Sequence, residues 1–389
     1  MKKNIALMYA IALLQGMVFY GPVATLYRQR QGLSVFQITL IESISLILCL
    51  LLEIPWGIAA DKLGYRRTMI FCCGLFFVSK IVFWQAAGFG AFLLERVMLS
   101  VVMAGLSGVD TSILYLSCER GQSQRVFGIH GALGTAGLLA ASVIFSLFIG
   151  DDYRLAGALT AASYGLAALA ALFLSEVKAE ETSRPGRREF LALARGIFTD
   201  KPLLVFLIST AFFTEAHQTL TVFLGQIQYA RCGLSPAAIG YCFTAVTLAG
   251  FCGVFSAFVT KKAGVKKAGA VFYGAAALAC LMPAVGGAAA SVGGILGLRI
   301  TFTLFEPFQA ELQNRQIKTS LRATALSINA MIVESIGAGT NLIFGSLAQI
   351  SLRAAFFFGG ALCLAGLGLF LWWHRRAALF AQTSPAWEK

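Results

Sequence analysis

The stretch Gly57-Ile-Ala-Ala-Asp61-Lys-Leu-Gly64-Tyr-Arg66-Arg67 is a short polar turn between two long apolar segments. Gly64 lacks a Cβ atom and can take the positive φ that a tight turn requires. Arg66 and Arg67 bring positive charge to the level of the cytoplasmic lipid headgroups, and Asp61 is the lone anion among the cations. A solvated loop would explain the cations but not the spacing of Gly57, Asp61 and Gly64.

The composition identifies an integral membrane protein. Of the 389 residues, 58% are hydrophobic and 13% are charged, and the mean hydropathy is +0.77, which lies far from the values of soluble domains. The net charge of +13 would suggest nucleic-acid binding in a soluble protein, but these charges follow the membrane boundaries, so no nucleic-acid partner is expected. The nine cysteines show no zinc or redox spacing, and we expect neither a metal nor a cofactor.

Twelve apolar segments predict an all-α membrane protein, because a bilayer core of about 30 Å needs about 20 apolar residues per helix. The longest polar stretch, residues 176–201, predicts a cytoplasmic linker between an N-terminal six-helix half (1–175) and a C-terminal half (202–373), with a tail over 374–389. The predicted helices are 5–26, 35–59, 68–87, 91–116, 126–149, 155–175, 202–228, 236–260, 268–288, 291–314, 323–347 and 354–373.

The distribution of lysine and arginine predicts the orientation in the membrane. An even number of helices puts both termini on one side, and the loops on that side hold 23 of these cations. The opposite loops hold five: Arg28, Arg30, Arg154, Arg231 and Arg353. By the positive-inside rule, both termini are cytoplasmic.

The second half repeats the first at an offset of 200 residues around the opening turn. Gly264 corresponds to Gly64, whereas Lys261 stands where the first half has Asp61. Two related six-helix halves are the arrangement from which many transporters build a central, alternately accessible site.

The spacing G-x-x-x-D-K-x-G-x-R-R resembles the loop 2–3 signature of the major facilitator superfamily and matches it at every position. The run Glu53-Ile-Pro55-Trp-Gly57 resembles a pattern of many bacterial facilitators of the drug and metabolite efflux type. The resemblance implies twelve helices in two pseudo-symmetric halves and transport by alternating access. The segment 126–149 has glycines at a spacing of three, which permits close helix approach, but lacks the Gly-Pro motif frequent in antiporters of the family.

The resemblance also implies a cytoplasmic gate. Glu119 resembles the acidic residue that family members place against loop 2–3. Together with the start of the eleventh helix near Arg322, it would hold the gate closed while the cavity faces outward. The expected members are Gly57, Asp61, Gly64, Arg66, Arg67, Glu119 and Arg322.

Eleven ionisable side chains lie within the predicted membrane helices. Such a group is costly unless it faces the bundle interior, water or a partner, so each is a candidate for binding substrate or protons. Eight are carboxylates and three are cations: Glu42, Glu53, Lys80, Glu95, Arg96, Asp110, Glu215, Arg299, Glu306, Glu311 and Glu334.

Helical spacing groups these residues by face. Glu42 and Glu53 are eleven residues apart and share nearly one face, about 16 Å apart along the axis. Glu53 either binds ligand or protons, or only caps a distortion at the nearby proline. Arg96 and Asp110 lie within roughly 40° of each other on a continuous helix. Glu95 must point away from its neighbour Arg96, and we expect it near the outer headgroups.

Arg96 resembles the arginine of a second family signature, which is associated with proton coupling or an anionic substrate group. The Gln-Gly that follows it in that signature is absent here, so a buried ion pair with Glu42 or Glu53 stays open as the alternative. Arg299 takes the equivalent place in the second half and shares a face with Glu306.

Two further segments of the second half carry candidate residues. Pro307 follows Glu306 and removes a backbone hydrogen bond, so we expect a kink or local unwinding that lines a binding cavity. Glu306 is therefore the leading substrate or proton residue of this half. Glu215 is a further candidate. His217, with an unperturbed pKa of about 6.5, could relay protons, but a neutral core histidine is the simpler interpretation.

The excess of membrane carboxylates over cations favours a secondary active transporter that exports a cationic or amphipathic compound in exchange for protons. A carboxylate in a membrane helix can exchange a proton or accept a cation. The alternative is proton-coupled uptake of an anionic metabolite, with Arg96, Arg299 and Lys80 as its ligands. A non-transporting sensor on the same fold is a third hypothesis, which a flux assay in vesicles would separate.

No nucleophile-base pair, metal constellation or phosphate-binding loop is present in the sequence, which argues against an enzyme. We expect a small-molecule substrate, a proton or another coupling ion, and the lipid bilayer as partners. The expected state is a monomer in the inner (plasma) membrane.

Overall fold

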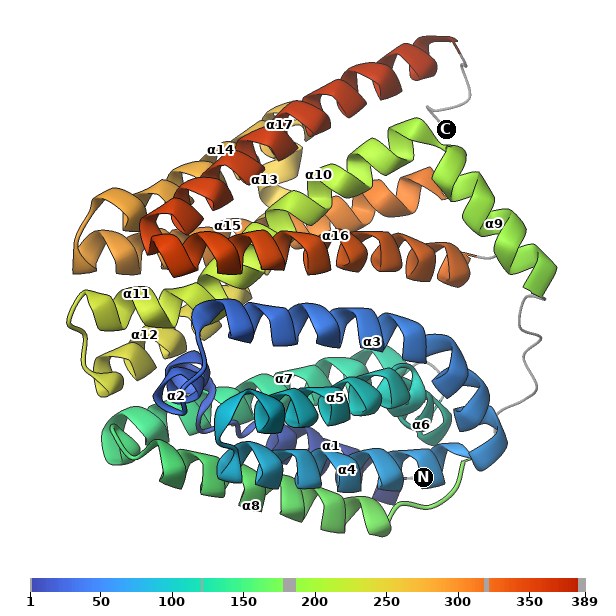
Figure 1. Ribbon diagram of the computed structural model, residues 1–389. Coiled ribbons are helices and arrows are strands. Elements are labelled where there is room, and N and C mark those ends of the chain that lie inside the picture. Colours follow the sequence, from blue (N-terminus) through green and yellow to red (C-terminus); the bar gives the residue numbers. More distant parts are fainter. Residues whose placement is uncertain (1, 120–121, 178–186, 318–321, 384–389) are drawn as a thin grey trace. The chain divides into compact units, whose positions relative to one another are not determined.

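A computed structural model describes residues 2–119, 122–177, 187–317 and 322–383 (Figure 1). Within these ranges the chain is helical and contains no strand. Twelve helical segments are long and apolar enough to cross a membrane, which confirms the predicted fold class. Their bounds are Lys2–Arg30, Val35–Glu53, Tyr65–Gln85, Gly88–Ser117, Ser123–Ile149, Tyr153–Leu172, Lys201–Arg231, Pro236–Ala263, Val265–Val285, Ala288–Gln316, Thr324–Ile350 and Leu352–Arg376.

The chain packs into two compact units. The first comprises Met1–Thr182 with Gly233–Thr247, and the second comprises Ser183–Cys232 with Leu248–Lys389. The sequence-based boundaries, which assign all of 202–373 to one half, stay a prediction.

The first unit is an assembly of helices in which α1 packs against α7 and α8, α4 packs against α5 and α8, and α3 packs against α5. Its elements are α1 (Lys2–Gly16), the short 3-10 helix η1 (Gly21–Val23), α2 (Ala24–Arg30), α3 (Val35–Leu63), α4 (Tyr65–Gln85), α5 (Gly88–Leu106), α6 (Val109–Ser117), α7 (Ser123–Ile144), the π-helical turn η2 (Phe145–Ile149) and α8 (Tyr153–Leu172).

Glycines bring α1 and α7 into backbone contact. A Cβ atom on Gly16 would lie 2.1 Å from the carbonyl oxygen of Gly134, and one on Gly137 would lie 2.2 Å from that of Leu13. Small residues permit this close approach in membranes, where packing rather than the hydrophobic effect drives helix association. The structure thus confirms the close approach predicted from the glycine spacing.

The fourth membrane span is broken in its second half. Helix α5 ends at Leu106, Gly108 takes a left-handed conformation with φ +81°, and α6 begins at Val109. The rotation of about 100° per residue in a continuous helix therefore does not relate side chains on α5 to those on α6. The predicted shared face of Arg96 on α5 and Asp110 on α6 is therefore wrong.

The prolines, by contrast, do not interrupt their helices. Pro55 lies inside α3, and Pro307 lies inside α15 (Ala288–Gln316), which runs without a break. The local unwinding expected at Pro307 is therefore wrong.

Helix α12 (Pro236–Ala249) starts in the first unit. The Thr244 and Ser142 hydroxyls lie 2.8 Å apart, and a Cβ on Gly240 would lie 2.1 Å from the Ser146 hydroxyl oxygen. Glycine at position 240 thus lets the first turns of α12 lie directly on α7 and η2.

In the second unit α14 packs against α15 and α17, and α10 packs against α16 and α17. Its elements are α9 (Arg187–Thr199), α10 (Lys201–Gln218), the π-helical turn η3 (Thr219–Leu224), α11 (Gly225–Arg231), the 3-10 helix η4 (Gly250–Phe255), α13 (Ser256–Ala263), α14 (Val265–Val285), α15, α16 (Arg322–Ile350) and α17 (Leu352–Thr383).

The glycine of the opening turn and its counterpart adopt the same backbone conformation. Gly64 has φ +88° and ψ 149°, and Gly264 has φ +76° and ψ 157°. This region is open essentially to glycine alone. The structure confirms the positive φ predicted at Gly64 and the local correspondence at an offset of 200.

We predict that Gly64→Ala lowers the free energy of unfolding by about 1–3 kcal/mol, because alanine at this φ is strained. A new Cβ would also lie 3.2 Å from the Glu176 carboxylate oxygens. The measurement is thermal unfolding of the detergent-purified protein. Gly74→Ala in α4 is the matched control, since a Cβ at that position meets nothing within 4 Å. Equal stability of the two variants would contradict the prediction.

Candidate functional site

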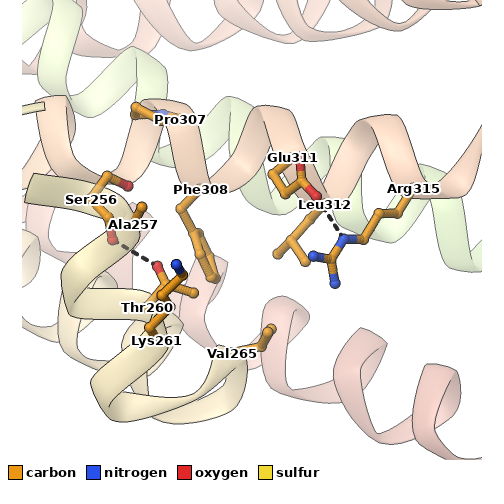
Figure 2. A pocket seen from close by; sticks show the side chains of 10 residues that line it. All are labelled: Ser256, Ala257, Thr260, Lys261, Val265, Pro307, Phe308, Glu311, Leu312 and Arg315. Atoms are coloured by element: carbon orange, nitrogen blue, oxygen red, sulfur yellow. Dashed lines mark hydrogen bonds and ion pairs between the residues drawn. The ribbon is translucent and has the colours of Figure 1, made fainter. Parts of the chain in front are cut away.

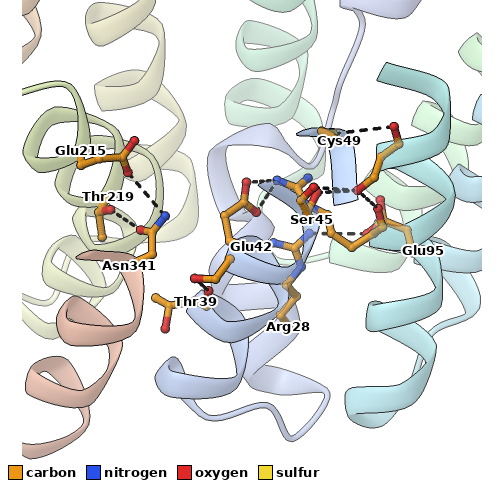
Figure 3. Close-up of polar contacts among 12 residues, drawn as sticks. Arg28, Thr39, Glu42, Ser45, Cys49, Glu95, Glu215, Thr219 and Asn341 are labelled. Atoms are coloured by element: carbon orange, nitrogen blue, oxygen red, sulfur yellow. Dashed lines mark hydrogen bonds and ion pairs between the residues drawn. The ribbon is translucent and has the colours of Figure 1, made fainter. Parts of the chain in front are cut away.

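An ion pair between Glu42 on α3 and Arg96 on α5 joins two helices of the first unit (Figure 3). The Arg96 guanidinium donates to both carboxylate oxygens of Glu42. The Arg96 and Glu42 side chains are 19% and 10% exposed. Of the alternatives that the sequence left open for Arg96, the structure shows the ion pair with Glu42.

The contact between α3 and α5 continues one turn further along both helices. The hydroxyls of Ser45 and Ser100 lie 2.7 Å apart, and the Cys49 thiol donates to the Ser100 carbonyl at 3.6 Å. The ion pair therefore lies at one end of a row of polar contacts between these two helices.

A second charge cluster lies beside the first and is more deeply buried. The Glu95 carboxylate is 3.6 Å from the Arg28 guanidinium on α2 and 3.7 Å from the Lys80 ammonium on α4. The Glu95 side chain is 1% exposed. The expected depth of Glu95 near the outer headgroups stays a prediction. The assignment of Arg28 to an outer loop is wrong, because Arg28 lies on α2 and is buried.

Aromatic rings surround these two cations. Lys80 donates to the Tyr20 hydroxyl at 3.0 Å and lies 4.9 Å from the centre of the Phe76 ring. The Arg28 guanidinium lies 5.5 Å from the centre of the Phe83 ring. Ring faces stabilise cations electrostatically, most strongly where water is excluded. The aromatics thus supply part of the solvation that burial removes.

The two clusters together carry a positive excess. Three cations, Arg28, Lys80 and Arg96, face two carboxylates, Glu42 and Glu95. The excess of carboxylates counted over all the membrane helices thus does not hold in this part of the molecule.

The other acidic candidates of the first unit lie apart from these clusters. Glu53 is half-buried on α3 and makes no ion pair among the described residues. Asp110 lies in the first turn of α6, where one carboxylate oxygen accepts from the Thr111 backbone amide at 2.6 Å. The structure brings Glu42 and Arg96 together, but places neither Glu53 nor Asp110 in contact with them.

In the second unit, Glu215 belongs to a polar network that the sequence did not predict. Its carboxylate accepts from the Asn341 amide on α16 at 3.5 Å, and the Thr219 hydroxyl donates to the Asn341 carbonyl oxygen at 2.5 Å (Figure 3). A Cβ on Gly337 would lie 2.4 Å from Glu215, so glycine makes room for the carboxylate. The network joins α10 to α16.

The remaining candidates of the second unit do not form an ion pair with one another. His217 is buried and stacks on Phe302 with ring centres 3.9 Å apart, and its ring nitrogens have no hydrogen-bond partner among the described residues. Arg299 and Glu306 lie on the same helix, α15, without an ion pair in the described part of the chain. Glu306 is exposed.

The cytoplasmic gate is described in part. The Arg66 side chain donates to the carbonyl oxygens of Leu172 and Leu174, and its backbone amide donates to Glu176 at 3.2 Å. Glu119 is exposed and accepts from Gln122 at 2.9 Å. Arg67 is exposed as well, whereas the side chains of Asp61 and Arg322 lie outside the described residues. Gly57 lies within α3. The gate stays a prediction.

A cavity of about 390 Å³ lies among α13, α14 and α15 of the second unit (Figure 2). Its wall includes Lys261, the counterpart of Asp61, and an ion pair of 2.8 Å between Glu311 and Arg315. Glu306 is not among its lining residues, although the next two residues are. Among the described residues no group of three or more His, Cys, Asp and Glu side chains could hold a metal ion.

Sequence reasoning missed two polar residues of these clusters, Arg28 and Asn341, and also His130, which lines a pocket of about 220 Å³ in the first unit. Arg28 was counted with the outer loops because the apolar run ends next to it. Asn341 carries no charge and was not searched for. His130 lies in an apolar segment, and a search for histidines as well as charged residues would have found it.

The twelve membrane-capable helices in the described part of the chain and the family match define a multi-pass membrane protein of the transporter class. The family model of the Major Facilitator Superfamily matches residues 5–340, so the chain belongs to this superfamily.

Solved structures of transporters share the fold. The nucleoside transporter NupG superposes with a TM-score of 0.81 at 16% identity, covering 96% of this chain and 99% of NupG. A D-xylose-proton symporter gives 0.71 at 14% identity, covering 95% and 97%. A bacterial homolog of the human lysosomal transporter Spinster gives 0.70 at 17% identity, covering 96% and 94%. These identities show a common fold alone. No curated protein sequence matches the chain.

We predict that Glu95→Gln lowers the free energy of unfolding by about 3–5 kcal/mol, because it leaves Arg28 and Lys80 buried without their carboxylate. The measurement is the fraction of monodisperse protein that survives heating in detergent. Glu311→Gln is the matched control, because its partner Arg315 is exposed and surface ion pairs contribute little.

A second variant keeps this prediction testable if Glu95→Gln does not fold. Adding Lys80→Met to Glu95→Gln removes one of the two uncompensated cations and should recover part of the lost stability. Stability of Glu95→Gln equal to that of Glu311→Gln would contradict the prediction.

Proposed function

We propose that this chain is a secondary active transporter that couples proton movement to the passage of a small polar organic solute. The observation that carries the proposal is the Glu42–Arg96 pair, in which a carboxylate and a guanidinium meet on two membrane helices. Glu42 is buried and Arg96 is only slightly exposed, so the pair lies inside the helix assembly rather than on its surface. Ionisable groups inside membrane spans commonly mark proton and substrate pathways.

The proposed cycle uses competition for Arg96. A proton that binds the Glu42 carboxylate removes the charge that holds the guanidinium, and Arg96 is then free to donate to an acceptor group of the solute. When Glu42 releases the proton, the ion pair forms again and the solute leaves. Solute and proton thus bind together and leave together.

The neighbouring carboxylate, Glu95, is not suited to this exchange. Two cations, Arg28 and Lys80, lie within 4 Å of it, and its side chain is 1% exposed. A proton or a solute would have to displace both cations from Glu95, whereas Glu42 has one cationic partner.

The positive excess of the clusters favours a solute with an anionic or acceptor-rich group, taken up with protons. This is the uptake alternative of the sequence analysis, with Arg96 as the main ligand. Two proteins of similar fold are, by their descriptions, a nucleoside transporter and a D-xylose-proton symporter. Solutes of both kinds are rich in hydrogen-bond acceptors, in agreement with the proposal.

The second candidate function is proton-driven export of a cationic or amphipathic compound by an antiporter of the efflux type. The observation that favours it is Glu306, an exposed carboxylate within a membrane span that makes no ion pair in the described part of the chain. A cation and a proton would compete for this group. The two candidates differ in the charge of the solute and in the residue that binds it.

The proposal also includes the location and the oligomeric state of the protein. We place the protein as a monomer in the inner (plasma) membrane, with both termini cytoplasmic as the lysine and arginine distribution indicates. The predicted halves, 1–175 and 202–373, would move against each other during the cycle.

We predict that adding a pool of small organic anions and polar neutral solutes to proteoliposomes triggers inward proton flux in the parent protein. Arg96→Ala should abolish this flux, because it removes the group that the solute and Glu42 share. Glu42→Gln should abolish the proton flux that the solute triggers, since glutamine cannot carry a proton. The measurement is an internal pH dye.

Controls separate the two candidate functions. Asp151→Asn should keep the parental flux, because this exposed carboxylate lies between two membrane spans. Flux triggered by a pool of organic cations and lost in Glu306→Gln would overturn uptake in favour of export. A parent protein that moves protons with neither pool would contradict proton coupling itself.

A further inference from the structure

A separate pocket of about 220 Å³ lies inside the first unit, at the break in the fourth membrane span. Its wall is formed by α1, α4, the end of α5, α6 and α7. The lining residues that matter for its chemistry are Gln15, Met69, Asp110, His130, Gly131 and Gly134.

Backbone features of α5, α6 and α7 create this space. The turn at Gly108 ends α5 and starts α6 anew, so Asp110 lies in a first helical turn, at the level of the break. On the opposite wall, α7 presents glycines instead of side chains. A Cβ on Gly131 would meet nothing within 4 Å, and one on Gly134 would meet only the Ala12 carbonyl oxygen at 3.8 Å.

Two of the lining residues can change their charge, Asp110 and His130, and the Asp110 charge is close enough to act on the imidazole. The groups that α1 and α4 bring to the pocket are neutral. Gln15 of α1 donates to the Cys73 thiol of α4 at 3.5 Å, and Met69 of α4 is apolar. A carboxylate and an imidazole thus line the same space, and no lysine or arginine is among its lining residues.

The size of the pocket allows water to join the two groups. A water molecule takes about 30 Å³ of liquid volume, so the pocket has room for several. A water molecule hydrogen-bonded to both the Asp110 carboxylate and the His130 imidazole would provide a path along which a proton can pass.

The pocket lies at a different depth from the Glu42–Arg96 pair. From Arg96 to Leu106 at the end of α5 is ten residues, or about 15 Å along the helix axis. His130 lies near the start of α7, which follows the loop after α6. The positive-inside rule places that loop in the cytoplasm, so the pocket belongs to the cytoplasmic half of the unit.

We propose that Asp110 and His130 form a second proton-binding site, at which the transported proton exchanges with cytoplasmic water. The imidazole accepts the proton from water or from a neighbouring hydronium ion, the ionised Asp110 stabilises the resulting imidazolium, and the proton later returns to water. The role in transport rests on the proton coupling proposed above. The binding of a proton by this pair does not.

The first test needs no solute. The chain has only three histidines, so the imidazole signals of ¹⁵N-histidine-labelled protein in nanodiscs can be assigned by comparison with His130→Gln. The titration covers about pH 4 to 8, and we expect the His130 imidazole to gain a proton as the pH falls within this range. Asp110→Asn should weaken its proton affinity about tenfold, because it removes the charge that stabilises the imidazolium. The signals of His217 and His374 should not change.

This titration has two outcomes that would overturn the proposal. One is a His130 signal that stays neutral over the whole range, and the other is a titration that Asp110→Asn leaves unchanged. Asp151→Asn, an exposed carboxylate of the same unit, is the matched control and should have no effect.

The second test fills the pocket without removing either group. Gly131→Leu projects a side chain into the open space, whereas Gly128→Leu, also in open space on α7 but outside the lining, is its matched control. In proteoliposomes with an active parent, we expect Gly131→Leu and His130→Gln to reduce proton-driven solute accumulation at least tenfold. Exchange of labelled for unlabelled solute at equal pH should stay near the parental rate.

The two tests distinguish failure of this inference from failure of the proposed function. A parent that moves neither solute nor protons contradicts the proposed function, and the titration still decides whether the pair binds a proton. An active parent whose accumulation survives both His130→Gln and Gly131→Leu overturns the role of the pocket in coupling.

Discussion

The constraint on which this structure depends is the cost of a charge inside a membrane. Each ionised group in a span needs an opposite charge, a hydrogen bond or a ring face within reach. In the first unit Glu95 meets this need for Arg28 and Lys80, and Glu42 meets it for Arg96. These contacts tie α2, α3, α4 and α5 together, so the groups that suit proton coupling also hold the unit in shape.

The same constraint divides the two carboxylates by function. Glu95 is almost completely buried and has two cations, Arg28 and Lys80, as its partners. Glu42 has one cation as its partner, and that partner is itself the group that a polar solute would bind. An ion pair that can be broken from either side, by a proton or by a solute, is the physical basis of the coupling that we propose.

Much of the fold could be predicted from the sequence, because hydropathy and glycine conformation are local properties. The twelve spans and the positive φ of Gly64 are examples. The candidate site was harder to predict from the sequence. Helical spacing showed that Glu95 and Arg96 point in different directions but not which of them is buried. The break at Gly108 could not be predicted either, since a single glycine inside an apolar run is compatible with a continuous helix. Arg28 and Asn341 acquire their roles only from tertiary contacts with distant helices.

The central claim is that Glu42 exchanges a proton while Arg96 is its counter-ion. Infrared difference spectroscopy between acidic and neutral pH tests it most directly, because it detects a protonated carboxyl group in the membrane without a known solute. The account predicts a protonated-carboxyl band in the parent protein that is lost in Glu42→Gln and grows at neutral pH in Arg96→Ala. Identical difference spectra for the parent and Glu42→Gln would contradict it.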